Sequence, residues 1–94
     1  MIHDFADPEA ARIWSGRRSR RLPADIQATA LRKLRLLNHA RALSDLSAPP
    51  GNRLEALKGD RTGQYSIRVN AQWRICFLWR DGGPADVEIV DYHD

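Results

Sequence analysis

Hydrophobic residues recur at two different periods along the chain, and the change of period separates a helical part from a β part. Between residues 24 and 42 the apolar positions are spaced by three or four, which predicts an amphipathic helix. Its apolar stripe consists of Ile26, Ala30, Leu34 and Leu37. Residues 64–69 and 73–79 alternate between apolar and polar instead, which predicts two strands that each bury one face.

Cap and turn signals predict the remaining elements. Asp7 offers an N-cap and Pro8 a first-turn proline, so a short helix is expected from Pro8 until Gly16 ends it. Further strands are expected at residues 1–5, 54–57 and 87–92. The order β-α-α-β-β-β-β is typical of an α+β fold, with two N-terminal helices packed on one face of a small antiparallel sheet. Residues 1–94 are expected to form one domain, because this length supports a single core.

The alternation of the two central strands places two arginines together. Ile67 and Ile75 are expected on the face that meets the helices, so Arg68 and Arg74 fall on the opposite, open face. A guanidinium group presents a planar fork of donors that suits a phosphate. The pair therefore predicts a phosphate site, and the alternative is two ordinary surface arginines.

Charge is distributed unevenly along the chain. The net charge is +3 and the isoelectric point about 9.6, yet residues 12–41 hold nine Arg or Lys and one acid, Asp25. This segregation favours a polyanionic partner, and the alternative is a solvated helix face. Side chains expected to contact phosphates lie on the long helix and in the turn before residue 64: Arg32, Lys33, Arg35, Lys58 and Arg61.

The chain closes on an acid, a phenol and an imidazole at the end of the last predicted strand. Asp91 and His93 are candidates for proton transfer, because an unperturbed imidazole titrates near pH ~6.5. Tyr92 is a candidate for stacking on a base or donating a hydrogen bond. The alternative is an idle histidine at a frayed terminus.

Other kinds of site are not indicated by the sequence. Cys76, the one cysteine, lies in an apolar run and is expected to be a buried structural thiol. The sequence has no zinc-ligand spacing and no Gly-rich nucleotide motif, so neither a metal nor a cofactor is expected. It also has no stretch long enough to cross a bilayer and no secretory signal, which predicts a cytoplasmic protein without a membrane partner.

Three segments carry a resemblance to a known family. The stretches RLEALKGDR, YSIRVNAQWRICF and VEIVDYH resemble the HigB-type toxins of bacterial type II toxin–antitoxin systems, within the RelE/ParE superfamily. The likeness extends over nearly the whole chain, from MIHDF through the LPADIQATALRKLRLL helix. It implies a RelE-like fold in which the active-site arginine is Arg74, and in which Asp91, Tyr92 and His93 match the terminal acid, tyrosine and histidine.

The resemblance also implies an activity and partners. Such toxins are endoribonucleases that enter the A site of the 70S ribosome and cleave mRNA there. A helix-turn-helix antitoxin of the HigA type holds them inactive, and the complex binds operator DNA through the antitoxin. The chain departs from the pattern at Glu55, where some members carry a histidine, so either the activity is lower or another group acts as the base.

Metal-independent cleavage by the 2′-hydroxyl fits these residues. Arg74, with Arg68 or Lys58, would stabilise the phosphorane, and Asp91 or His93 would be the base or the acid. Two other functions stay open from the sequence. The superfamily includes gyrase-poisoning inhibitors, which as a rule lack the terminal acid-Tyr-His set, and a nucleic-acid-binding module without chemistry is the third possibility.

Overall fold

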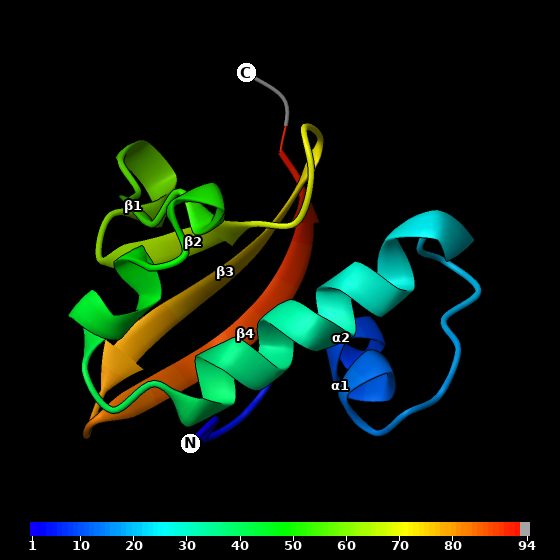
Figure 1. Cartoon of the computed structure of the whole chain (residues 1–94), viewed down its shortest axis with the longest axis horizontal. Coiled ribbons are helices and arrows are strands. Elements are labelled where there is room, and N and C mark those ends of the chain that lie inside the picture. Colours follow the sequence, from blue (N-terminus) through cyan, green and yellow to red (C-terminus); the bar gives the residue numbers. More distant parts are fainter. Residues whose placement is uncertain (93–94) are drawn as a thin grey trace.

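The computed structural model describes residues 1–92 as a four-stranded antiparallel sheet with two helices on one face (Figure 1). The helices are α1 (Pro8–Trp14) and α2 (Ala24–His39), and the strands are β1 (Glu55–Ala56), β2 (Gln64–Arg68), β3 (Trp73–Arg80) and β4 (Gly83–Asp91). Three short helical turns lie between α2 and β2: η1 (Leu43–Ser47), η2 (Pro50–Asn52) and η3 (Gly59–Arg61). The strands follow sequence order, β1-β2-β3-β4, so the predicted α+β architecture is confirmed.

The core lies between the helices and one face of the sheet. Ile26, Leu34 and Leu37 of α2 are buried against Ile67 and Ile75, as the two periodicities predicted. Asp7 caps α1, because its carboxylate accepts a hydrogen bond from the Glu9 amide at 2.9 Å. The predicted start of α1 is therefore confirmed.

The predicted N-terminal strand is reduced to one bridge. Phe5 pairs with Val87 in parallel, and the His3 amide donates to the Pro84 carbonyl at 2.8 Å. The segment lies beside an irregularity in the ladder, because Cys76 pairs with Glu88 while Leu78 pairs with Ala85. Such a bulge twists its strand and interrupts regular pairing, so only a short contact forms there.

The face opposite the helices is only partly open, and the prediction of a wholly open face is wrong. Ser66 and Cys76 lie on this face, and each is 0% exposed. The side chains of Arg61 and Glu88 pair over it, with 2.5 Å between Nη1 and Oε1. The prediction that Cys76 is buried is confirmed, and burial raises the pKa of its thiol.

Candidate functional site

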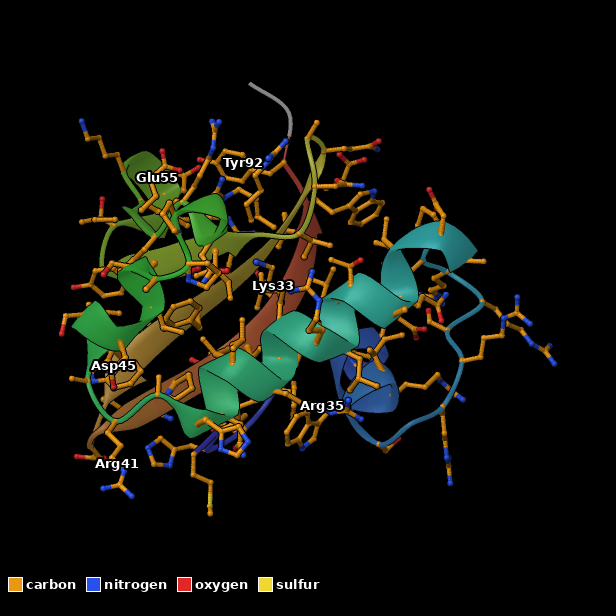
Figure 2. All side chains as sticks on the ribbon, viewed as in Figure 1. Lys33, Arg35, Arg41, Asp45, Glu55 and Tyr92 are labelled. Carbon is orange, nitrogen blue, oxygen red and sulfur yellow. The ribbon has the colours of Figure 1, made fainter. Side chains whose placement is uncertain are left out.

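A cavity of about 360 Å³ opens at the end of the sheet where β2 stops and β3 begins. It lies at the same end of the molecule as the labelled Glu55 and Tyr92, and Arg41 and Asp45 lie at the other end (Figure 2). In residues 1–92, eight residues from three separate segments form its walls: Arg53, Leu54, Glu55, Arg68, Asn70, Ala71, Arg74 and Tyr92. Antiparallel pairing brings these segments together, because the end of β2, the start of β3 and the end of β4 all lie at the same end of the sheet.

Arg68 and Arg74 are direct cross-strand partners in this cavity. Like charges placed opposite each other on one sheet face repel, which disfavours the pair in the absence of an anion. An oxyanion between the two guanidinium groups relieves that repulsion and accepts several hydrogen bonds. The structure thus brings together the two arginines that the alternation predicted.

The Arg74 guanidinium group is held in place by neighbouring oxygens. Its Nε donates to Ser66 Oγ at 2.7 Å, and its Nη2 donates to the Arg53 carbonyl at 2.6 Å. The Arg74 side chain is only 12% exposed, so it lies along the sheet rather than in solvent. Arg53 is the C-cap of η2 and has φ +46°, a left-handed conformation that a non-glycine residue seldom adopts.

Glu55 supplies the carboxylate of the cavity. Its Oε2 lies 3.6 Å from Arg74 Nη2, and its side chain is 56% exposed. The carboxylate is therefore both beside the arginine and open to a ligand. The family resemblance marks Glu55 only as the replacement of a histidine and gives it no role. Strand register is the signal that could have placed Glu55 at the site: it pairs with Ser66, and cross-strand partners share a face.

The terminal residues separate according to strand alternation. Tyr92 lines the cavity, and its backbone N–H donates to the Gln72 carbonyl at 2.7 Å, which fixes it beside β3. Asp91 pairs with Trp73 on the other face, where the Gln72 amide nitrogen donates to its carboxylate at 3.1 Å. His93, predicted as a catalytic acid or base, lies outside the described residues.

Two basic residues predicted beside the cavity do not line it. Lys58 is exposed immediately before η3. Arg61 is engaged by Glu88 and also donates to Gln64 Oε1 at 3.0 Å. The hydrogen bond that Arg61 donates to Glu88 raises the pKa of Arg61, and the ion pair links η3 to β4.

The predicted basic face of α2 is divided. Arg32 and Arg35 are exposed, whereas Lys33 is 6% exposed and donates from Nζ to Asn52 Oδ1. Figure 2 shows Lys33 on the side of α2 that faces the sheet, with Arg35 on the side nearer α1. The placement of Lys33 on the exposed face is wrong, because η2 covers this position. Burial lowers the pKa of Lys33, and Arg32 and Arg68 lower it further.

The part of the chain that the structure describes shows neither a metal-binding cluster nor a membrane-spanning helix. In residues 1–92, three or more His, Cys, Asp or Glu side chains do not come together in a way that would hold a metal ion. Among the helices of the same residues, none has the length and apolar character needed to span a bilayer.

Sequence comparisons identify relatives over most of the chain. The model of a family described as the RelE-like toxin HigB of type II toxin–antitoxin systems matches residues 3–93. Toxin HigB-1 of Vibrio cholerae serotype O1 is 50% identical over 83 residues, which is 87% of either chain. Endoribonuclease HigB of Proteus vulgaris is 46% identical over 41 residues, or 44% of this chain and 45% of that protein.

A structural comparison supports the same fold. The YoeB–YefM complex from Staphylococcus aureus contains a chain that superposes with a TM-score of 0.62 over 100% of this chain and 99% of that one. Sequence identity in that pair is 17%, so this likeness bears on the fold alone. With the family match over residues 3–93 and the 50% identity to a HigB toxin, the chain belongs to the HigB-like family of RelE-like toxins of type II toxin–antitoxin systems.

Proposed function

We propose that the protein is an endoribonuclease that cleaves translated mRNA in the ribosomal A site and thereby arrests growth. The observation that carries this proposal is the cavity where Arg68 and Arg74 face each other beside a carboxylate and a phenol. The relative named endoribonuclease HigB supports the reaction class. Cleavage inside the ribosome and a cytoplasmic location are parts of the proposal that rest on the family resemblance.

The reaction we propose uses the RNA's own 2′-hydroxyl and no metal. A base removes the 2′-hydroxyl proton, the 2′-oxygen attacks the adjacent phosphorus, and the bond to the 5′-oxygen breaks after an acid protonates that oxygen. The products are a 2′,3′-cyclic phosphate and a free 5′-hydroxyl. The protein's task is therefore to hold one phosphate, accept one proton and donate one proton.

Arg74 is the residue proposed to stabilise the phosphorane, with Arg68 opposite it. Its guanidinium group is already fixed by Ser66 and Arg53, so little reorganisation is needed when charge develops. Preorganised donors of this kind are worth roughly 3–4 kcal/mol each when placed at the developing charge.

Glu55 is our candidate for the base, since it is the carboxylate that lines the cavity beside Arg74. Tyr92 is proposed to position or stack a nucleotide base, because this residue belongs to the same cavity wall. With Glu55 as the base, we propose His93 as the acid, since the family resemblance makes it a candidate for either role. Asp91 remains a candidate although it lies on the opposite face of the sheet, and Lys58 and Arg61 remain candidates for outer phosphate contacts.

The partner proposed for this toxin is an antitoxin, of the helix-turn-helix HigA type that the family resemblance implies. The match to the HigB-like family of type II toxin–antitoxin systems supports such a partner, and the chain of similar fold in the YoeB–YefM structure is likewise part of a complex. Operator DNA would be bound through the antitoxin. Arg32 and Arg35, exposed on α2, are proposed to contact ribosomal RNA phosphates.

One experiment separates this function from its alternatives. Primer extension on a translated message, after induction of the toxin, should show new cuts at codon spacing inside the reading frame and none in a matched untranslated message. Inhibition of DNA supercoiling without such cuts would identify a gyrase poison instead. RNA binding with neither effect would leave a binding module without chemistry.

A further inference from the structure

A second basic surface lies far from the cavity, in the loop that joins α1 to α2. Arg17, Arg18, Arg20 and Arg21 in this loop, and Arg12 on α1, are all exposed. The loop runs along the side of the molecule away from β1, and nitrogen-tipped side chains extend from it into solvent (Figures 1 and 2). None of these arginines lines the candidate cavity. We call these five residues the arginine loop surface.

The loop has a defined conformation because one buried serine organises it. Ser19 is 3% exposed, and its hydroxyl donates to Glu9 Oε1 at 2.6 Å. The same hydroxyl oxygen accepts hydrogen bonds from the Arg21 and Leu22 amides, both at 3.2 Å. With the Ser19 side chain directed inward, the arginines on both sides of it are directed outward.

Gln27 on α2 fastens the loop to the helix. Its Oε1 accepts from the Ser19 amide at 3.0 Å, and its Nε2 donates to the carbonyls of Ser19 and Leu22 at 2.8 and 2.9 Å. The arginine side chains therefore extend from a fixed backbone. A fixed backbone lowers the conformational entropy that a ligand must overcome when it binds.

Within the described residues, the arginines of this surface are not ion-paired with a carboxylate. In residues 1–92 the arginines with a carboxylate partner are Arg61, Arg74 and Arg80, so the five loop-surface arginines have none. A hollow of about 490 Å³ is lined by four of the five arginines and by Glu9, whose carboxylate accepts from Ser19. Such a charge concentration raises the local density of polyanions.

The character of the surface favours RNA over an acidic protein. Stable protein interfaces bury apolar anchors at their centre, but in residues 1–92 the exposed large hydrophobic residue is Met1, outside this surface. Residues 15–23 contain no aromatic side chain on which an unpaired base would stack. Arginines alone suit the phosphates of a folded RNA helix, which proteins recognise by shape and backbone.

We propose that the arginine loop surface docks the phosphate backbone of a folded RNA while the Arg74 cavity holds the strand to be cut. The proposal rests on the proposed function, because it assumes that the substrate is presented by a larger RNA assembly. It makes the loop a docking surface additional to the exposed arginines of α2. The loop arginines take no part in the chemical step.

The test compares two variants that lose the same charge. Arg18→Gln with Arg20→Gln removes two loop arginines, and Arg41→Gln with Arg80→Gln removes two exposed arginines elsewhere. Each is made in an Arg74→Ala background, and binding to a fluorescein-labelled RNA hairpin is measured by anisotropy over a salt series. The loop pair should bind roughly tenfold or more weakly at physiological salt, with the slope of log K against log salt lower by about 1.4–1.8. The control variant should lose much less affinity for the hairpin.

Equal losses in the two variants, or unchanged binding in the loop variant, would overturn the proposal. A loop variant that keeps its affinity for the hairpin but loses affinity for poly-glutamate would overturn it in favour of an acidic protein partner. All variants carry Arg74→Ala, so the measurement reports binding alone and does not depend on RNA cleavage. A failure of the proposed nuclease activity would appear in the primer-extension assay and would not change the interpretation of the binding result.

Discussion

Arg74 has the most constrained side chain in the candidate site. In residues 1–92 its hydrogen bonds use Nε and Nη2, so the Nη1 group is the one left to meet a phosphate. Since a guanidinium has five N–H donors in a rigid plane, fixing two nitrogens also fixes the direction of the third. Ser66 thereby acts as a positioning residue, because it touches Arg74 and does not line the cavity.

Replacing Ser66 with Ala should slow RNA cleavage about tenfold while the fold remains intact. The change removes a hydrogen bond to a charged group worth roughly 1.5 kcal/mol, which is about a factor of ten in rate. Single-turnover cleavage and the thermal melting curve measure the two effects. Ser47→Ala, at an exposed serine, is the matched control. A full-rate Ser66→Ala enzyme would show that Arg74 needs no such support.

Replacing Glu55 with Gln should reduce cleavage by about 10²–10⁴, the usual contribution of a general base. The amide keeps the size of the side chain but accepts no proton. Asp60→Asn removes a nearby exposed carboxylate that does not line the cavity, so it should retain the rate. Equal rates for wild type and Glu55→Gln, measured on ribosome-bound message, would assign the base to another residue.

Among single residues, the sequence correctly predicted the two arginines of the cavity but did not separate Asp91 from Tyr92. Alternation within β2 and β3 was sufficient to place Arg68 and Arg74 on the same face, and the structure adds that they are direct cross-strand partners. Asp91 and Tyr92 are adjacent in one extended segment, so they point to opposite faces and only Tyr92 lines the cavity. Chemical suitability alone gave no means of separating them.

Among the elements, the contact between α2 and η2 determines the position of the cavity wall. Asn52, fully buried, accepts from Lys33 and donates to the carbonyls of Leu46 and Ala48, both at 3.2 Å. The next residue is Arg53, whose carbonyl holds Arg74. A buried lysine thus links the helix layer to the site through two consecutive residues.

Lys33 should make the stability of the protein depend on pH in the alkaline range. Its pKa is lowered from 10.5 in the folded state, so between that lowered value and 10.5 the unfolded chain binds more protons. The contribution of Lys33 to the free energy of unfolding then rises with pH across this window, as the burial penalty on the charged form disappears. The raised pKa of Cys76 lowers the free energy of unfolding as pH increases above 9.0, so urea denaturation at several alkaline pH values must compare wild type with a variant that lacks the lysine.

Lys33→Met is the comparison, because methionine fills similar space and does not titrate. The wild type should gain stability relative to Lys33→Met as pH increases through the window, and the difference should level off above 10.5. Parallel pH profiles for the two proteins would mean that the folded state does not disfavour the lysine charge.

Helix periodicity alone was insufficient to predict this element contact. Lys33 precedes Leu34 on the helix and belongs to the edge of the apolar stripe, where a side chain is covered only if another segment passes over it. That segment, η2, is a proline-containing turn with no periodic signal of its own. Burial at a stripe edge depends on a tertiary contact that the local pattern does not contain.

In the whole molecule, one face of the sheet packs against the helices to form the core, and the candidate site lies at one end of the other face. The helices, sheet order and family were predictable, because long periodic segments and specific motifs determine them. The partial covering of the second face could not be predicted from the sequence, because it depends on the ion pair between Arg61 and Glu88, which are 27 residues apart. The loop that carries the arginine loop surface lies on the side of the molecule away from β1 (Figure 1).

The most direct test of the account is the rate of message cleavage by Arg74→Ala on programmed ribosomes. Arg80→Ala is the matched control, since Arg80 belongs to the same strand but pairs with Asp4, both about half exposed. Loss of a preorganised donor predicts a rate about 10²–10³-fold below wild type for Arg74→Ala, with Arg80→Ala near wild type. An Arg74→Ala protein that folds and cleaves at the wild-type rate would contradict the assignment of this cavity as the nuclease site.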